Sequence, residues 1–151
     1  MEEVKTDIIS HIENLVAQNA VDQFTFIHGM RGFQNLKVDT IKLPCCILDY
    51  PIISNDIQSA GGRLNPQFPI TLLWLYKSKI NDQPKELHKL VMKARQSGRD
   101  LFTRLNNDSE NVESISEHSR EGLYQIFDSV LTGCMQKMNV TLIDMDGYCV
   151  T

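Results

Sequence analysis

The longest apolar run in the chain covers residues 68–77 and contains the single tryptophan, Trp74. It is too short to cross a bilayer, which takes about 20 apolar residues. The run is rich in β-branched and aromatic side chains. Prolines precede it, and an Asn-Asp pair and another proline follow it. This pattern predicts a central strand that is buried on both faces.

Two stretches show the apolar spacing of amphipathic helices. The first covers residues 4–18, and acidic residues stand near its start, where the helix dipole favours negative charge. The second covers residues 84–105, where Asn81 or Asp82 can cap it and a proline fits its first turn. Gly98 lies on its apolar stripe at a cost of about 1 kcal/mol relative to alanine. We therefore expect Gly98 to allow a close approach between this helix and the sheet.

Shorter apolar segments predict the remaining strands. Gly29 and Gly32 are expected to end the first of them. The last strand is expected to pair with the segment just before a Thr132-Gly133 turn, which makes a terminal hairpin. Residues 112–118 predict either a weak edge strand or an extended linker. The other predicted strands cover residues 23–28, 36–42, 45–50 and 135–143.

These elements predict an α+β fold in two layers. A mostly antiparallel sheet of four to five strands is packed by an N-terminal helix and one long central helix. The chain of 151 residues is expected to form a single domain, residues 1–151, because a chain of this length buries roughly 70% of its unfolded surface.

Residues 51–67 separate two predicted strands and form an unusually long loop. Several aliphatic side chains argue against simple disorder: Ile52, Ile53, Ile57 and Leu64. Either the loop folds back on its own domain, or it buries these side chains against a neighbouring subunit. The glycine pair beside Arg63 indicates loop flexibility rather than an anion site, because it lacks a phosphate-loop context.

Charge is unevenly distributed along the chain. The net charge of −4 argues against a dedicated nucleic-acid binder. Residues 77–105 nevertheless hold eight basic and three acidic residues, a net +5, and residues 108–128 hold six acidic residues and one arginine, a net −5. Two interpretations stay open: Lys85, Lys89 and Lys93 line a solvated helix face, or the basic helix of one subunit meets an acidic face of the next.

Residue types that carry out chemistry are present but scattered. The four histidines form no HxxxH pair, and the four cysteines show no CxxC spacing. We therefore expect four free thiols, no metal site, no cofactor and no catalytic residue. Cys45 and Cys46 are neighbours in a strand and cannot both point inward. Cys134 has no basic residue close in sequence to lower its pKa. The acidic start predicts neither a secretion signal nor a lipid anchor.

The order of helix, strands, long loop, central strand, long helix and terminal strand pair resembles the phage tail-terminator and head–tail joining (neck) proteins. The loop lies between Tyr50-Pro51 and Phe68-Pro-Ile-Thr-Leu-Leu, and the central strand runs through Asn81-Asp-Gln-Pro84 into the basic helix. The late segment Leu123-Tyr-Gln-Ile-Phe-Asp128, with Leu131-Thr-Gly133 and Tyr148-Cys149, is similar to the end of small tail proteins from phages and prophages of Bacteroidetes-like hosts. The resemblance is one of pattern over most of the chain.

The resemblance implies a non-enzymatic virion structural protein that is assembled in the host cytoplasm. It would form a ring, a hexamer or dodecamer, at the tail end or the head–tail neck. Helices would lie outside and sheets would join around a channel that DNA crosses as cargo. The implied partners are other copies and neighbouring head, neck or tail-tube proteins, with no membrane. The expected subunit-interface residues are Ile52, Ile53, Ile57, Arg63, Leu64, Lys85, Lys89 and Lys93.

The chain departs from the family in that its basic residues cluster on a helix and not on a loop. Whether this helix faces DNA, a neighbour or solvent stays open. A second hypothesis is a small soluble adaptor or binding module with one discrete protein partner. An enzyme would need a deep pocket with convergent polar groups, and the sequence offers no such set.

Overall fold

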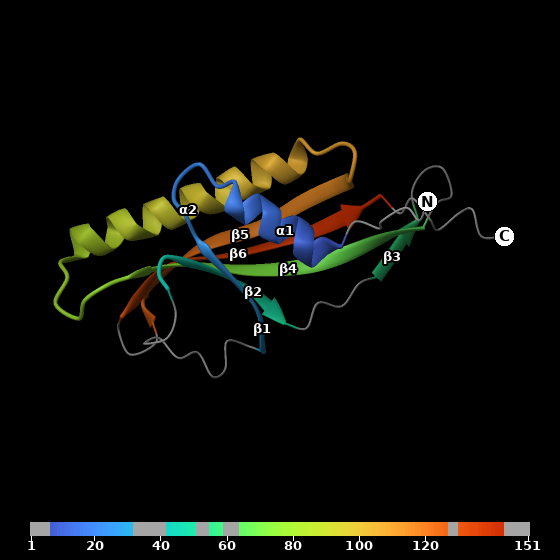
Figure 1. Cartoon of the computed structure of the whole chain (residues 1–151). Coiled ribbons are helices and arrows are strands. Elements are labelled where there is room, and N and C mark those ends of the chain that lie inside the picture. Colours follow the sequence, from blue (N-terminus) through green and yellow to red (C-terminus); the bar gives the residue numbers. More distant parts are fainter. Residues whose placement is uncertain (1–6, 32–41, 51–54, 59–63, 127–129, 144–151) are drawn as a thin grey trace.

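The computed structural model describes residues 7–31, 42–50, 55–58, 64–126 and 130–143. They form two helices and six strands (Figure 1). In chain order these are α1 (Ile8–Ala17), β1 (Thr25–Arg31), β2 (Cys45–Tyr50), β3 (Asn55–Gln58), β4 (Leu64–Lys77), α2 (Pro84–Asn106), β5 (Val112–Gln125) and β6 (Leu131–Leu142).

All six strands belong to one sheet. Its order is β1-β2-β4-β6-β5, and β3 pairs with the first part of β4. Strands β1 and β2 are parallel, and the other pairs are antiparallel. Both helices cover the same face, with α2 over β5 and β6 and α1 near β1 (Figure 1). The predicted two-layer α+β fold is confirmed, with one strand more than expected because β3 forms inside the predicted loop.

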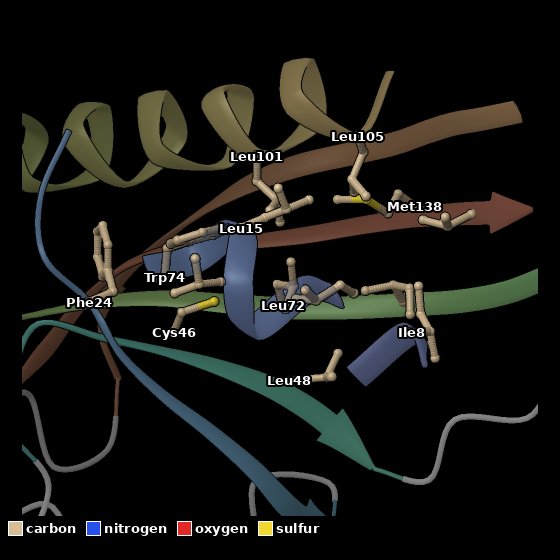
Figure 2. Packing of buried hydrophobic residues seen from close by; sticks show 14 of the residues in the cluster. Ile8, Leu15, Phe24, Cys46, Leu48, Leu72, Trp74, Leu101, Leu105 and Met138 are labelled. Atoms are coloured by element: carbon tan, nitrogen blue, oxygen red, sulfur yellow. The ribbon is translucent and has the colours of Figure 1, made fainter. Parts of the chain in front are cut away.

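The main core fills the space between the helices and this face of the sheet. Alternate residues of β4 point into it: Ile70, Leu72, Trp74 and Tyr76. Leu15 comes from α1, and Leu101 and Leu105 from α2, as Figure 2 shows. A second cluster of Cys45, Ile47, Leu73, Leu75 and Leu131 lies on the other face. The central strand is thus buried on both faces, as predicted.

The helix boundaries follow local chemistry. Helix α1 begins at Ile8 because the Asp7 carboxylate accepts hydrogen bonds from the backbone N–H groups of Ile9 and Ser10. Helix α2 begins at Pro84, and its N-cap residue is Gln83, which makes no side-chain cap bond. The prediction that Asn81 or Asp82 caps α2 is therefore wrong, since the helix starts later than either residue allows.

The first strand continues past the position where it was predicted to end. Strand β1 runs through Gly29 to Arg31, and its register with β2 shifts between His28 and Met30. The glycine therefore sits at an irregularity within the strand rather than at its end. Gly32 and residues 36–41 of the weaker predicted strand lie outside the described residues.

The predicted terminal hairpin is confirmed, but its turn is elsewhere. Residues 112–118 belong to a full strand, β5, which pairs along its length with β6. Thr132 and Gly133 lie inside β6 and not in a turn. Gly133 is opposite Leu75, where a Cβ atom would come within 1.7 Å of the Trp74 carbonyl oxygen. Gly133 is therefore needed because β4 and β6 come very close together at this position, and not because the chain turns there.

Candidate functional site

The basic side of α2 contains the three lysines predicted to form an interface. Lys85, Lys89 and Lys93 are all exposed. The Lys89 ammonium lies 3.7 Å from a Glu86 carboxylate oxygen on the same helix. Lys85 makes no ion pair with another described residue. The lysines therefore share one helix but have different surroundings.

Lys93 is engaged within its own chain. Its Nζ atom lies 3.5 Å from Asp22 Oδ2 and 5.1 Å from the centre of the Tyr76 ring. Burial raises the pKa of Tyr76 to about 12, so this phenol stays protonated at neutral pH. Asp22 belongs to the segment that follows α1. Lys93 thus holds that segment against α2. We interpret the cluster of Lys93, Asp22 and Tyr76 as structural.

The same segment contacts α2 at two further points. Asn19 donates a 3.0 Å hydrogen bond from its side-chain amide to the Ser97 carbonyl oxygen. The Ala20 N–H donates to Asp100 Oδ2 at 3.3 Å, and Asp100 also pairs with Arg104 at 2.9 Å. These bonds hold the end of α1 against the middle of α2.

Gly98 allows α2 to approach the sheet, as predicted. A Cβ atom there would lie 3.0 Å from Gln136 Oε1. Gln136 is completely buried in β6 and donates a 2.8 Å hydrogen bond to the Gly98 carbonyl oxygen. Its Oε1 atom accepts a 3.0 Å bond from the indole N–H of Trp74. The glycine therefore makes room for the amide that joins the helix to the central strand.

The hydrogen bonds continue from Gln136 to the surface. Gln136 Nε2 also donates to Glu117 Oε2 at 2.6 Å. The other oxygen of Glu117 pairs with Arg120 at 2.9 Å, and Arg120 donates to the Arg95 carbonyl oxygen at 3.2 Å. A satisfied polar network of this kind fixes one arrangement of a core. It fixes the position of α2 over β5 and β6.

Sequence reasoning missed this network, although a signal was present. The core-facing residues of β6 are Cys134, Gln136, Met138 and Val140. A glutamine in such a row is a polar group on an apolar face. Buried amides need partners. The alternation of core-facing residues in β6 therefore indicates, from the sequence alone, that the Gln136 amide is buried and makes several hydrogen bonds.

The segment predicted as a loop contains a β-hairpin. Ile57 lies in β3 opposite Asn65, and Leu64 opens β4 opposite Gln58. The prediction of an irregular loop over residues 51–67 is therefore wrong for its second part, because the backbone there pairs as a ladder. Nothing is described of the side chains of Ile57 and Leu64. The remaining interface candidates of this segment, Ile52, Ile53 and Arg63, lie outside the described residues.

This β3–β4 hairpin extends beyond the body of the sheet. Pairing between β4 and β6 begins only at Gln67, opposite Thr141, and β2 pairs with residues 72–75. Among the described strands, residues 64–66 pair with β3 alone. Figure 1 shows the hairpin at the end of the molecule where α2 finishes. A two-stranded ribbon is marginally stable by itself, so contacts with other elements stabilise it. Asn65 within this hairpin is buried.

The described thiols are free and buried. Cys45, Cys46 and Cys134 form no disulfide, as predicted, and Cys149 lies outside the described residues. Cys45 and Cys46 point to opposite faces, yet both are buried because each face carries an apolar cluster there. Burial raises the pKa of Cys134 to about 11 and that of Cys45 to about 12. Thiols with such pKa values are poor nucleophiles at neutral pH.

The histidines of the described chain lie apart from one another. His11 Nε2 lies 2.8 Å from Asp108 Oδ2, which joins α1 to the turn after α2. His118 contacts Asn139 at 2.9 Å on β5 and β6. Within the described ranges, no group of three His, Cys, Asp or Glu side chains is placed to hold a metal ion.

The basic helix and the acidic strand are neighbours within one chain. Helix α2 packs on β5, so the +5 and −5 segments lie side by side. Several charges are nevertheless exposed and make no ion pair with another described residue: Lys85, Arg95 and Arg99 on α2, and Glu110, Glu113 and Glu121 in or beside β5. These charges are available to a partner.

A comparison of the chain with protein-family models finds no match, and a comparison with curated proteins finds none either. In the part of the chain that the structure describes, no helix is both long and apolar enough to span a membrane.

Proposed function

We propose that this chain is a non-enzymatic virion structural protein that assembles with copies of itself into a ring at the tail end or head–tail neck. The observation that carries the proposal is the β3–β4 hairpin, which extends β4 past the end of its described pairing with β6. The pattern resemblance to tail-terminator and neck proteins supplies the biological setting. DNA would cross the ring as cargo, and neighbouring head, neck or tail-tube proteins would be the further partners.

The edges of the sheet differ in how open they are to a second chain. Strand β5 is long, but its register with β6 shifts twice, and it carries the exposed carboxylates Glu113 and Glu121. Irregular registers and charges discourage edge-to-edge pairing. Residues 64–66 of β4 show no register shift in their pairing with β3. This contrast favours the hairpin, and not β5, as the element that joins subunits.

Contacts between two different surfaces of identical chains produce closed rings when the rotation between copies closes, and filaments when it does not. A hairpin that reaches from one subunit to the next makes this type of contact. The two-layer architecture, with both helices on one face, is compatible with a ring whose helices lie outside. These features support the ring over a symmetric dimer.

Mass photometry over a range of concentrations tests the proposal, with the chain alone and with any neck or tail-tube proteins that neighbouring genes encode. We expect closed oligomers of one size in at least one of these mixtures. Ile57→Asp in β3 is expected to weaken assembly at least about tenfold, because it places a charge in the proposed interface. Lys137→Glu, at an exposed position of β6, is the matched control and should assemble normally.

A chain that stays monomeric at every concentration, alone and with those partners, would overturn the proposal. A stable monomer that captures one discrete protein partner would instead favour the adaptor hypothesis. Circular dichroism of Ile57→Asp shows whether the variant is folded, so that lost assembly is not confused with lost structure.

A further inference from the structure

Exposed apolar side chains gather toward the end of the molecule opposite the β3–β4 hairpin. Among the described residues, the exposed large hydrophobic side chains are Ile80, Met92 and Tyr124. Ile80 is 74% exposed in the turn between β4 and α2, and Tyr124 is 52% exposed near the end of β5. Met92 lies in the first half of α2. In Figure 1 the β4–α2 turn and the hairpin are at opposite ends.

The turn that carries Ile80 is held in place from both sides. The Lys79 N–H donates a 2.7 Å hydrogen bond to Asp82 Oδ2. The side-chain amide of Gln125 donates to the carbonyl oxygens of Lys79 and Ile80 at 3.0 and 3.2 Å. An exposed isoleucine on a backbone fixed in this way loses little conformational entropy when a partner covers it.

Gln125 itself adopts an uncommon backbone conformation to make these bonds. Its φ is 49°, in the left-handed region that residues other than glycine rarely adopt. The Gln125 N–H donates to Thr132 Oγ1 at 3.0 Å, and the Thr132 hydroxyl lies 3.0 Å from Ser78 Oγ. The ends of β4, β5 and β6 are therefore tied into one rigid unit beneath Ile80.

Tyr124 stands against α2 because a glycine leaves room for it. A Cβ atom on Gly122 would lie 2.9 Å from Val91 Cγ1 and 3.4 Å from a Tyr124 ring carbon. The ring thus lies beside the helix with half of its surface exposed. Tyrosine and methionine are enriched in protein interfaces. Lys85 and Lys89 lie on the first turns of α2, and Lys89 pairs with Glu86. We call the exposed residues on these neighbouring elements the end patch: Ile80, Lys85, Lys89, Met92 and Tyr124.

The described residues at the opposite end of the molecule are mostly acidic. Helix α2 ends at Asn106, and the turn into β5 carries Asp108, Glu110 and Glu113. Glu110 and Glu113 are exposed and make no ion pair with another described residue. The β3–β4 hairpin is at this same end (Figure 1). The two ends therefore complement each other in charge.

We propose that the end patch of one copy docks on the acidic end of a second copy, around Glu110 and Glu113. Copies then associate head to tail along the length of α2. This inference rests on the proposed function, because it requires the chain to assemble with itself. Each such contact leaves one end patch and one acidic end unused, so assembly continues until a ring closes.

Zero-length carbodiimide cross-linking of the wild-type chain tests the contact directly. The reagent joins a lysine amine to a carboxylate only where the two touch. Lys85 and Lys89 are separated from the end of α2 by about 25–30 Å of helix, so a link from either lysine to Glu110 or Glu113 must join two copies. We expect peptide mapping of the cross-linked oligomer to find these links. A cross-linked oligomer without them would overturn the inference.

Two complementary variants test it independently. Ile80→Ser/Tyr124→Ser removes the apolar part of the end patch, and Glu110→Lys/Glu113→Lys reverses the acidic end. Each variant alone should remain monomeric, and an equal mixture should form a dimer and nothing larger, because one intact pair of surfaces remains. Raising the salt to 0.5 M should weaken wild-type association about tenfold, since it screens exposed charges.

The outcomes separate this inference from the proposed function. If wild type assembles and both variants assemble equally well, the head-to-tail contact is wrong and the ring proposal stands. If wild type stays monomeric alone and with neck and tail-tube partners, the proposed function fails and this inference fails with it. Lys137→Glu is again the control. Circular dichroism and the fluorescence of the buried Trp74 show that each variant is folded.

Discussion

The two halves of strand β4 have different neighbours. Residues 72–75 lie between β2 and β6, with helices over one face and a second apolar cluster on the other. Residues 64–66 pair with β3 alone among the described strands. One continuous strand thus contributes the centre of the core and one side of a projecting hairpin. The first half therefore carries the packing that stabilises the fold, and the second half is the part of β4 that we propose takes part in assembly.

The buried half is organised around Trp74. Across the sheet, Cys46 pairs with Trp74, Trp74 with Cys134, and Cys134 with Gly122. Phe24 packs edge-on against the indole, with ring centres 5.0 Å apart. The residues on either side of Trp74 in this row are small, so the indole fits beneath the helices. The hairpin half contains Asn65, Pro66 and Gln67, which do not belong to the main apolar core, although Asn65 is buried.

The largest effect on stability is expected from Gly133→Ala, next to the buried half. A Cβ atom would lie 1.7 Å from the Trp74 carbonyl oxygen, and a backbone atom in the centre of a sheet cannot move aside. We expect the free energy of unfolding to fall by about 3 kcal/mol or more. Urea unfolding followed by Trp74 fluorescence measures it.

Gly122→Ala is the matched control for that measurement. Its new Cβ would meet the Val91 side chain at 2.9 Å, and a side chain has more freedom to adjust than a backbone carbonyl. The loss should therefore be smaller than for Gly133→Ala. Equal losses in the two variants would contradict the role given to the close strand approach at Gly133.

Removing the buried amide is expected to have the next largest effect. Gln136→Ala leaves the Trp74 indole N–H without its acceptor and takes a hydrogen-bond donor from Glu117. Leaving buried groups unpaired costs about 1–3 kcal/mol, so we expect a loss near 2 kcal/mol in urea unfolding. The control in the hairpin half is Gln67→Ala, whose amide makes a long 3.4 Å bond to Thr141 Oγ1. If Gln136→Ala and Gln67→Ala lower the free energy of unfolding equally, the buried half of β4 contributes no more to stability than the hairpin half.

A pH dependence of stability is also expected from the buried half. Burial raises the pKa of Cys134 to about 11 from 9.0, so the unfolded chain releases this proton at lower pH than the folded chain. The thiol's contribution to stability is therefore complete below pH 9 and is lost as pH rises toward 11. The slope is about 1.4 kcal/mol per pH unit for one thiol.

Urea unfolding of wild type and Cys134→Ala between pH 8 and 11 measures this slope. The variant lacks the titrating thiol, so its stability should fall less steeply over that range. Parallel curves for the two proteins would show that Cys134 ionises equally in the folded and unfolded chains. Burial of Cys134 beside Trp74 would then leave the pKa of its thiol unchanged.

The sequence by itself determined the two-layer α+β class, both helices, the buried central strand, the terminal hairpin and the role of Gly98. These features follow from the spacing of apolar side chains, because burial of those side chains is the main force that selects local structure. The same reasoning placed Lys85, Lys89 and Lys93 on one helix.

Only the tertiary structure decided the pairing of β3, the hub at Gln136, the close approach at Gly133 and the opposite ends marked by Ile80 and Glu110. Each depends on residues that are distant in sequence: Gly133 on Trp74, Gln136 on Gly98, and the Ile80 turn on Gln125. A periodic pattern records which face of an element is buried. It carries no information about which partner strand or helix covers that face, because that choice is made when the whole chain packs.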